Sequence, residues 1–99
     1  MPEKVSIRDL KGTVARVFDE PQTLRLKLEG GESRPEHQHP GKEVVLYVVE
    51  GSLTLSLGDR TYNLEEGDAI RFSGDQDISP KANEDVSALL VFVDSATAG

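Results

Sequence analysis

The two histidines of the chain, His37 and His39, lie one residue apart in the segment PEHQHPGKEVVLYVVEG, residues 35–51. Two imidazoles at this spacing suggest a divalent metal site, because imidazole is the commonest protein ligand for such ions. A catalytic zinc site, however, usually uses three protein ligands and a water molecule. His37 and His39 are therefore the candidate metal ligands, and they need a further donor to bind an ion tightly.

The sequence lacks the residues for several other familiar kinds of catalytic chemistry. The sequence contains no cysteine, which excludes a disulfide framework, a thiolate metal site and a cysteine nucleophile. It also shows no serine–histidine–acid order and no phosphate-binding glycine loop. The catalytic residues, if the protein is an enzyme, are unknown from the sequence.

The segments that must position the histidines are short β-strands. Apolar and polar residues alternate with period two in residues 23–28 and 52–57, a pattern typical of strands with one buried face. In the first of these we expect the basic side chains, Arg25 among them, to face water. Residues 44–49 and 88–92 are apolar on both faces, which predicts central strands that are covered on both sides.

Turn residues separate these strands at regular intervals. Gly58-Asp59 stands between two strand segments, a pattern typical of a tight β-hairpin. About eight or nine short strands result, while the three-and-four spacing of helices does not persist. The sequence therefore predicts an all-β antiparallel barrel.

Two stretches of the sequence resemble the motifs of the cupin family. Gly31, the two histidines and Gly51 follow the spacing of the first motif, and Gly67-Asp68 resembles the opening of the second. The chain is similar to a small single-domain cupin of the Cupin 2 type. This resemblance implies one domain over residues 1–99, with the conserved antiparallel jelly-roll (cupin) barrel at about residues 14–93.

The resemblance also identifies the positions of the metal ligands. In metal-binding cupins, the two histidines and a glutamate of the first motif join a histidine of the second. On this chain the glutamate position falls on Val44, and the second-motif histidine position falls on Ile78. The resemblance therefore implies a degenerate site, with no cofactor or a weakly bound divalent metal (Zn, Ni, Mn or Fe) at His37 and His39.

Glu43 is the alternative third ligand. It precedes Val44, so in a regular strand its side chain points to the opposite face. A β-bulge near Pro40-Gly41 would turn it inward and complete a set of two histidines and one carboxylate, which suits Fe(II), Mn or Zn. The simpler interpretation places Glu43 in solvent beside Lys42, because apolar Val44 fits an inward position without a bulge.

Aromatic and cationic side chains give less information. Tyr47, Tyr62, Phe72 and Phe92 stand on predicted strands and could line a pocket, but a role in the core is the simpler interpretation. Arg71 is expected to face outward.

Two functions agree with these residues. The preferred one is a non-catalytic cupin barrel that binds a small molecule, or serves as an accessory module, with weak or no metal binding. The alternative is a metal-dependent enzyme of the dioxygenase or isomerase type that uses His37, His39 and Glu43. The fold does not separate them, because this barrel hosts both, but the number of ligands favours the first.

The composition restricts the partners and the location. A net charge of −7, from 18 acidic and 11 basic residues, disfavours nucleic-acid binding. The acidity fits a solvated surface, and a salt-adapted source would give the same bias. No apolar leader and no bilayer-length stretch is visible, so we expect a cytoplasmic protein without membrane contact. Sheet edges and apolar strand faces that one small chain cannot cover predict a homodimer. The resemblance to cupins implies that an exchanged or abutting N-terminal strand, here residues 5–10, makes the contact.

Overall fold

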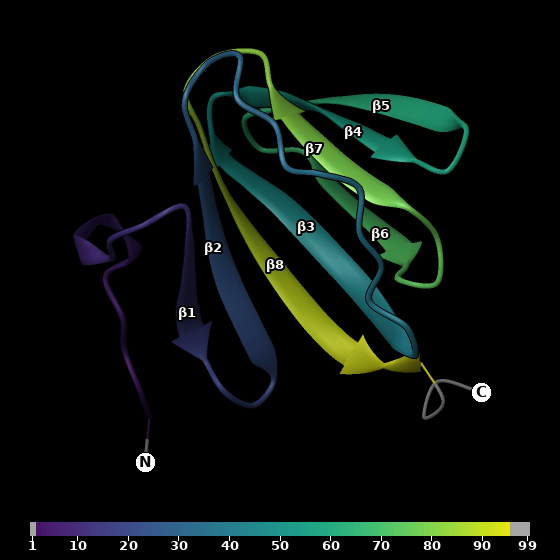
Figure 1. Ribbon diagram of the computed structural model, residues 1–99. Helices are drawn as coiled ribbons and strands as arrows, with labels where there is room; N and C mark the ends of the chain where they lie inside the picture. The colour runs from purple at the N-terminus through teal and green to yellow at the C-terminus, as the bar shows by residue number, and fades with distance from the viewer. Residues whose placement is uncertain (1, 96–99) are drawn as a thin grey trace.

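Two antiparallel β-sheets that face each other make up the protein (Figure 1). The computed structural model describes residues 2–95, so Met1 and residues 96–99 of the predicted domain lie outside the described residues. A short 3-10 helix, η1 (Ile7–Asp9), precedes the strands. The strands are β1 (Val14–Phe18), β2 (Gln22–Leu28), β3 (Lys42–Glu50), β4 (Ser52–Leu57), β5 (Arg60–Glu65), β6 (Ala69–Ser73), β7 (Ile78–Ala82) and β8 (Val86–Asp94).

The strand order is that of a jelly roll. The larger sheet has the order β1-β2-β8-β3-β6, and the smaller has the order β5-β4-β7. Every pair of neighbouring strands in the described residues is antiparallel, and the chain crosses repeatedly between strands that are distant in sequence. The predicted all-β antiparallel jelly-roll barrel is therefore confirmed. Within the described residues, no helix is long and apolar enough to cross a bilayer.

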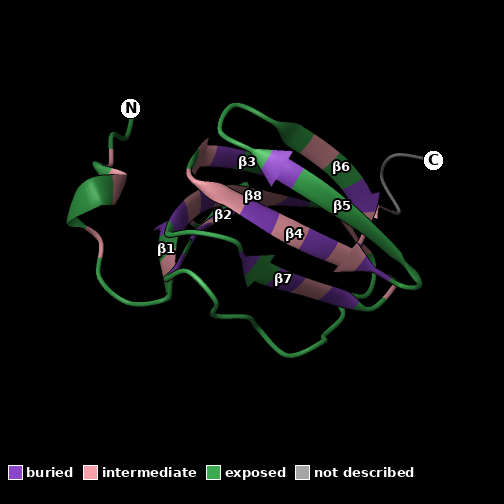
Figure 2. Cartoon of the chain, turned by 90° about the horizontal axis from the view of Figure 1, so that it is seen from above, coloured by how far each residue is buried: buried purple, intermediate pink, exposed green. Residues whose placement is uncertain are grey.

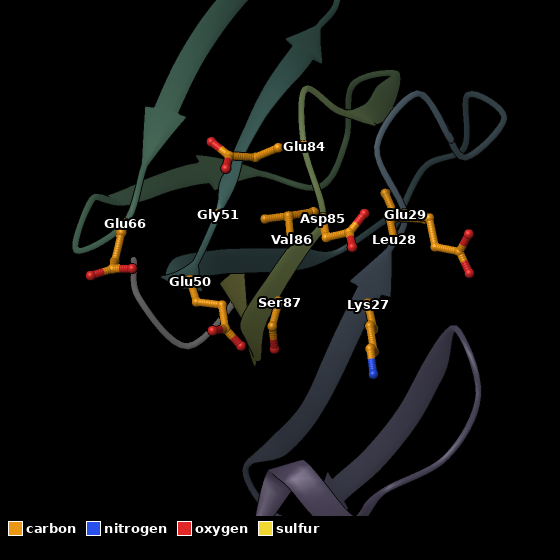
Figure 3. A pocket seen from close by; sticks show the side chains of 10 residues that line it. All are labelled: Lys27, Leu28, Glu29, Glu50, Gly51, Glu66, Glu84, Asp85, Val86 and Ser87. Atoms are coloured by element: carbon orange, nitrogen blue, oxygen red, sulfur yellow. The ribbon is translucent and has the colours of Figure 1, made fainter.

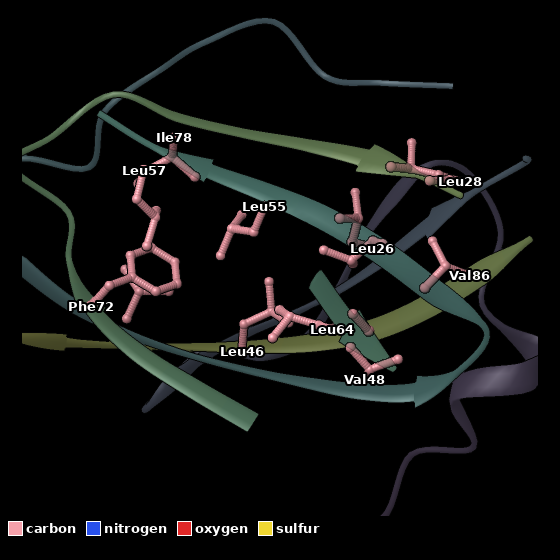
Figure 4. Packing of buried hydrophobic residues seen from close by; sticks show 14 of the residues in the cluster. Leu26, Leu28, Leu46, Val48, Leu55, Leu57, Leu64, Phe72, Ile78 and Val86 are labelled. Carbon is pink, nitrogen blue, oxygen red and sulfur yellow. The ribbon is translucent and has the colours of Figure 1, made fainter. Parts of the chain in front are cut away.

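The core lies between the two sheets, where the inward side chains of each strand meet (Figure 4). Figure 2 shows the cause, because buried and more exposed residues alternate along strands such as β4. The predicted hairpin at Gly58-Asp59 joins β4 to β5, with Leu57 opposite Arg60. The largest side chains that are fully or almost fully buried are those of Leu46, Leu53, Leu55, Val44 and Val48.

The outer face of the larger sheet differs from the prediction. Strands β3 and β8 are central, as expected, but the side chains of Val45 and Tyr47 are 38% and 42% exposed. The expectation that both faces are covered is wrong for the single chain. The physical reason is that a two-sheet sandwich covers only the inner face of each sheet, and the described chain provides no layer over this part of the outer face.

Arg25 also differs from the prediction, because it is buried and does not face water. Its guanidinium donates hydrogen bonds to the carbonyl oxygens of Ile7 (2.8 Å), Leu10 (3.2 Å) and Gly12 (3.1 Å). The N-terminal segment thus lies over β2. Residues 5–10, expected to form an exchanged or abutting strand, contain η1 and form no strand, and hydrogen bonds with Arg25 hold them against their own sheet.

Candidate functional site

The loop between β2 and β3 carries the histidines and runs alongside β7 (Figure 1). Its backbone pairs with that strand: the N–H of Arg34 donates to the carbonyl oxygen of Pro80 at 3.0 Å, and His37 forms an isolated bridge with Ile78. The loop therefore extends the smaller sheet irregularly. Pro35 provides no N–H for this pairing, which helps to explain why no regular strand forms here.

Gly74 fixes the position of the second histidine. The N–H of His39 donates to the carbonyl oxygen of Gly74 at 2.8 Å. A Cβ atom at residue 74 would lie 2.2 Å from the carbonyl oxygen of His39, which is closer than atoms can approach. The close approach of the loop to the end of β6 therefore requires glycine at this position.

A cavity of about 160 Å³ lies between the sheets and opens near this loop. Figure 4 shows several of its apolar side chains, among them Leu46, Leu55 and Ile78, directed into the space between the sheets. The polar side chains at the cavity are few. The lining residues are Val14, Leu24, Leu26, Arg34, His37, His39, Val44, Leu46, Leu55, Phe72, Ile78, Pro80, Leu90 and Phe92.

The two imidazole rings are in contact with each other. Their centroids are 4.8 Å apart and their planes meet at 89°, while the ring of His39 packs at 4.7 Å and 62° against Phe92. Nδ1 of His37 lies 2.9 Å from the carbonyl oxygen of Pro35. Because a carbonyl only accepts hydrogen bonds, Nδ1 carries the proton, and Nε2 of a neutral His37 is left as an acceptor.

Burial lowers the pKa of the His39 imidazole below its usual value of 6.5, and the neighbouring charge of His37 lowers this pKa further. A half-buried imidazole loses hydration, and hydration stabilises the charged form most. His39 is therefore neutral at neutral pH.

The residues around the histidines do not complete a metal site. Val44 and Ile78, at the positions of the missing ligands, are buried and line the same cavity. Among residues 2–95, no group of three or more His, Cys, Asp or Glu is arranged to hold a metal ion. Two imidazoles fall short of the three protein ligands that a catalytic zinc takes, so the described residues do not fit a tightly held metal.

Glu43 does not supply the missing ligand. Its pairing with Ser73 and that of Val44 with Phe72 follow a regular register, without a bulge at this end of β3. Oε1 of Glu43 lies 3.5 Å from Nε of Arg71, whose side chain is 76% exposed on the outer face of the sheet. The outward orientation predicted for Arg71 is confirmed. Glu43 also points away from the cavity, as the simpler interpretation expects, but it lies near Arg71 and its side chain is only 30% exposed, while Lys42 pairs with Asp94.

The aromatic residues differ in burial. Phe72 and Phe92 line the cavity and also belong to the core. Tyr47 is 42% exposed on the outer face of the larger sheet, and Tyr62, which pairs with Leu55 on the edge strand β5, is 37% exposed. Arg34, at the rim of the cavity, was missed by sequence reasoning. It lies between two residues of the first motif, but the motif does not indicate which way a side chain of an irregular loop points.

A separate acidic depression of about 650 Å³ lies at the other end of β3 (Figure 3). Two of its carboxylates, both between β7 and β8, join segments that are distant in sequence. Asp85 accepts a hydrogen bond from the N–H of Gly30 at 2.9 Å, and Glu84 accepts one from the hydroxyl of Ser52 at 3.0 Å. These two carboxylates therefore have a structural role. The acidic side chains that line the depression are Glu29, Glu50, Glu66, Glu84 and Asp85.

A jelly-roll barrel with a His-x-His loop at the rim of an apolar cavity defines a protein of the cupin class. The family model of the cupin domain, Cupin_2, matches residues 24–94, and the chain belongs to this family. A comparison with curated proteins finds no match.

Solved structures support the same fold. A conserved protein of unknown function from Streptococcus pyogenes has a TM-score of 0.69 and 23% identity, over 74% of this chain and 63% of that one. KdgF from a Halomonas species has a TM-score of 0.66 and 25% identity, over 72% of this chain and 66% of the KdgF chain. The chain thus spans slightly less than two thirds of the length of either. An RmlC-like cupin from Desulfovibrio desulfuricans has a TM-score of 0.82 and 14% identity, over 94% and 97%.

Proposed function

We propose that the protein is a non-catalytic cupin that binds a small, mostly apolar molecule in the cavity between its sheets, without a tightly held metal. The observation that carries this proposal is the pair Val44 and Ile78. Both side chains line the cavity beside the histidines, at the positions where a metal-binding cupin has ligands. Because apolar residues stand at these two positions, the site lacks two ligands and the cavity wall is apolar. An apolar wall favours ligand binding by burial of apolar surface.

The size of the cavity limits the ligand. An apolar cavity of about 150 Å³ in another protein holds one benzene molecule, and this cavity measures about 160 Å³. A single ring, or a branched chain of similar size, therefore fills it. Such a ligand gains roughly 25 cal/mol for each Å² of apolar surface that it removes from water.

A weak metal site used by an enzyme of the dioxygenase or isomerase type is the second candidate function. One observation favours it: the carbonyl oxygen of Pro35 accepts a hydrogen bond from Nδ1 of His37. Metal-binding imidazoles are commonly oriented by such a bond, which leaves Nε2 for the ion. The divalent ions Zn, Ni, Mn and Fe are the candidates, and His37 and His39 would hold the ion.

The experiment that separates the two functions starts with metal analysis of tag-free protein supplied with Zn(II), Ni(II), Mn(II) or Fe(II). The proposal expects traces of metal, while about one ion per chain would support the enzyme. Ligand binding is then followed by calorimetry with toluene. Leu90→Phe should fill the cavity and abolish binding, and Leu89→Phe is the matched control, because Leu89 pairs with Tyr47 on the outer face.

We also propose that the protein is a homodimer through the outer face of the larger sheet. Val45, Tyr47 and Val93 are exposed there, and in the β3–β8 register they lie beside Val91 and Leu89. The N-terminal segment occupies the neighbouring part of this face over β2, which leaves a free apolar strip along β3 and β8. A second copy can bury this strip against its own by two-fold symmetry. Nucleic acid is not an expected partner of so acidic a chain, and the absence of cysteine supports a cytoplasmic location.

A further inference from the structure

Arg34 introduces a permanent positive charge at the rim of an otherwise apolar cavity. Arginine stays protonated under all ordinary conditions. No other lining residue is an arginine, lysine, aspartate or glutamate. The chain as a whole carries a net charge of −7, so an arginine at this one opening is not explained by the average composition.

The backbone of Arg34 is fixed, while its guanidinium has no partner within the described part of the chain. Its N–H donates to the carbonyl oxygen of Pro80 at 3.0 Å, and its carbonyl oxygen accepts from the hydroxyl of Ser79 at 2.7 Å. Arg16 pairs with Asp19 and Arg25 binds three carbonyl groups. Arg8 and Arg60 also have no side-chain partner among the described residues, but neither lines this cavity. The five N–H donors of Arg34 are thus available to a group that enters the cavity.

We infer that the ligand of this cavity carries a carboxylate, which the guanidinium of Arg34 binds at the rim while the apolar remainder fills the space between the sheets. This inference rests on the proposed small-molecule function. It goes beyond that function, because it assigns a chemical class to the ligand and a specificity-determining role to Arg34. The ligand class is a small apolar monocarboxylic acid of about the size of benzoate, since a cavity of this volume holds one ring.

The chemistry of the rim favours a carboxylate over other anions and over cations. The planar guanidinium matches the two oxygens of a carboxylate with two parallel hydrogen bonds. A phosphate ester carries about two charges, and the rim offers one permanent cation within an acidic protein. Nδ1 of His37 is already engaged with the carbonyl oxygen of Pro35, so this nitrogen does not compete with Arg34 for the anion.

The test measures affinity by calorimetry for benzoate, benzyl alcohol, benzylamine and phenyl phosphate. The parent protein should bind benzoate roughly tenfold or more tightly than benzyl alcohol, because hydrogen bonds between charged groups exceed neutral ones by this order. Arg34→Gln should lower the affinity for benzoate much more than that for benzyl alcohol, and so remove the preference. Arg60→Gln is the matched control, with the same charge change away from the cavity, and should keep the preference.

The outcomes distinguish this inference from the function on which it rests. Equal affinities for benzoate and benzyl alcohol, or an Arg34→Gln variant that keeps the preference, would overturn the carboxylate assignment while the ligand-binding function stands. Tighter binding of phenyl phosphate than of benzoate would also overturn it. If none of the probes binds to the parent protein, the proposed function fails together with the inference. Because Arg34 is exposed, a thermal melt should confirm that Arg34→Gln is folded.

Discussion

His37 and Ile78 lie directly opposite each other. The N–H of His37 donates to the carbonyl oxygen of Ile78 at 3.1 Å, and the N–H of Ile78 donates to the carbonyl oxygen of His37 at 2.8 Å. Ile78, which stands where the second cupin motif has a histidine, is therefore the backbone partner of His37. Both side chains line the same cavity, so the substitution that removes a ligand also adds apolar wall.

Glu43→Gln should change neither the metal response nor the stability by much. The carboxylate lies 3.5 Å from an exposed guanidinium on the outer face, and exposed ion pairs contribute less than about 1 kcal/mol. Melting temperatures of parent and variant, with and without Zn(II), provide the measurement. A zinc-dependent rise that the parent shows and Glu43→Gln loses would mean that Glu43 is a ligand. His39→Gln serves as the comparison, since any weak site should respond to it.

The stability of the metal-free protein should fall as the pH decreases through about 6.5, in part because of His39. Burial, and then the charge of His37, lower the pKa of folded His39, whereas the unfolded chain takes up this proton near the usual value of 6.5. In the window below 6.5 the unfolded state binds more protons, so the free energy of unfolding decreases until the pH falls below the folded pKa. Urea unfolding at a series of pH values in EDTA measures this.

His39→Gln should flatten the pH dependence in that window, since it removes the group that titrates differently in the two states. His37→Gln should flatten it less, because desolvation is the larger cause of the shift and the charge of His37 the smaller. Parent and His39→Gln curves that run parallel from pH 7.5 to pH 5 would contradict the assignment.

Tyr47→Lys should convert the proposed homodimer to a monomer. Tyr47 is exposed in the apolar strip on β3 and β8, where it pairs with Leu89, and a lysine there would bring like charges into a two-fold interface. Tyr62→Lys is the matched control, because Tyr62 is similarly exposed but lies on the smaller sheet. Light scattering gives the mass of each protein. A monomeric parent at high concentration, or a dimer that survives Tyr47→Lys, would contradict the proposed interface.

Period-two alternation predicted the inner faces of the barrel well. Leu53 and Leu55 alternate with polar neighbours and are fully buried, and the strongly apolar segment at residues 44–49 forms a central strand. Alternation states only which residues share a face. It does not indicate whether another segment of the chain covers the outer face. For this reason Arg25 was wrongly expected to face water and Tyr47 was wrongly expected to be covered.

Two features of the candidate site could be predicted from the sequence: the His-x-His motif and the register of the strand that follows it. The spacing of the two histidines, and the one-residue offset between Glu43 and Val44, fixed which side chains can face the cavity. Arg34 and the contact of Gly74 with His39 depend on the path of an irregular loop across β7, and loops have no periodicity from which to read orientation. That Nδ1 of His37 binds the Pro35 carbonyl is likewise a property of the loop.

Val44→Glu combined with Ile78→His should rebuild a metal site beside His37 and His39. Without metal, the new carboxylate would lie in an apolar cavity, where an unpaired charge costs several kcal/mol or the group takes up a proton. The double variant should therefore be less stable than the parent in EDTA. Because an ion that binds only the folded state stabilises it in proportion to affinity and concentration, Zn(II) or Ni(II) should reverse the loss.

The matched control for this variant is Val45→Glu combined with Ile78→His, which places the same carboxylate on the outer face. At a concentration where parent and control are both monomeric, the control should fold with nearly the stability of the parent in EDTA, apart from the cost of the new histidine. It should bind metal much more weakly than the inward variant. Denaturant unfolding and metal titration of both proteins separate the two effects. If the inward variant is folded by circular dichroism and gains no affinity over the control, then Val44 does not face the two histidines closely enough to have replaced a ligand.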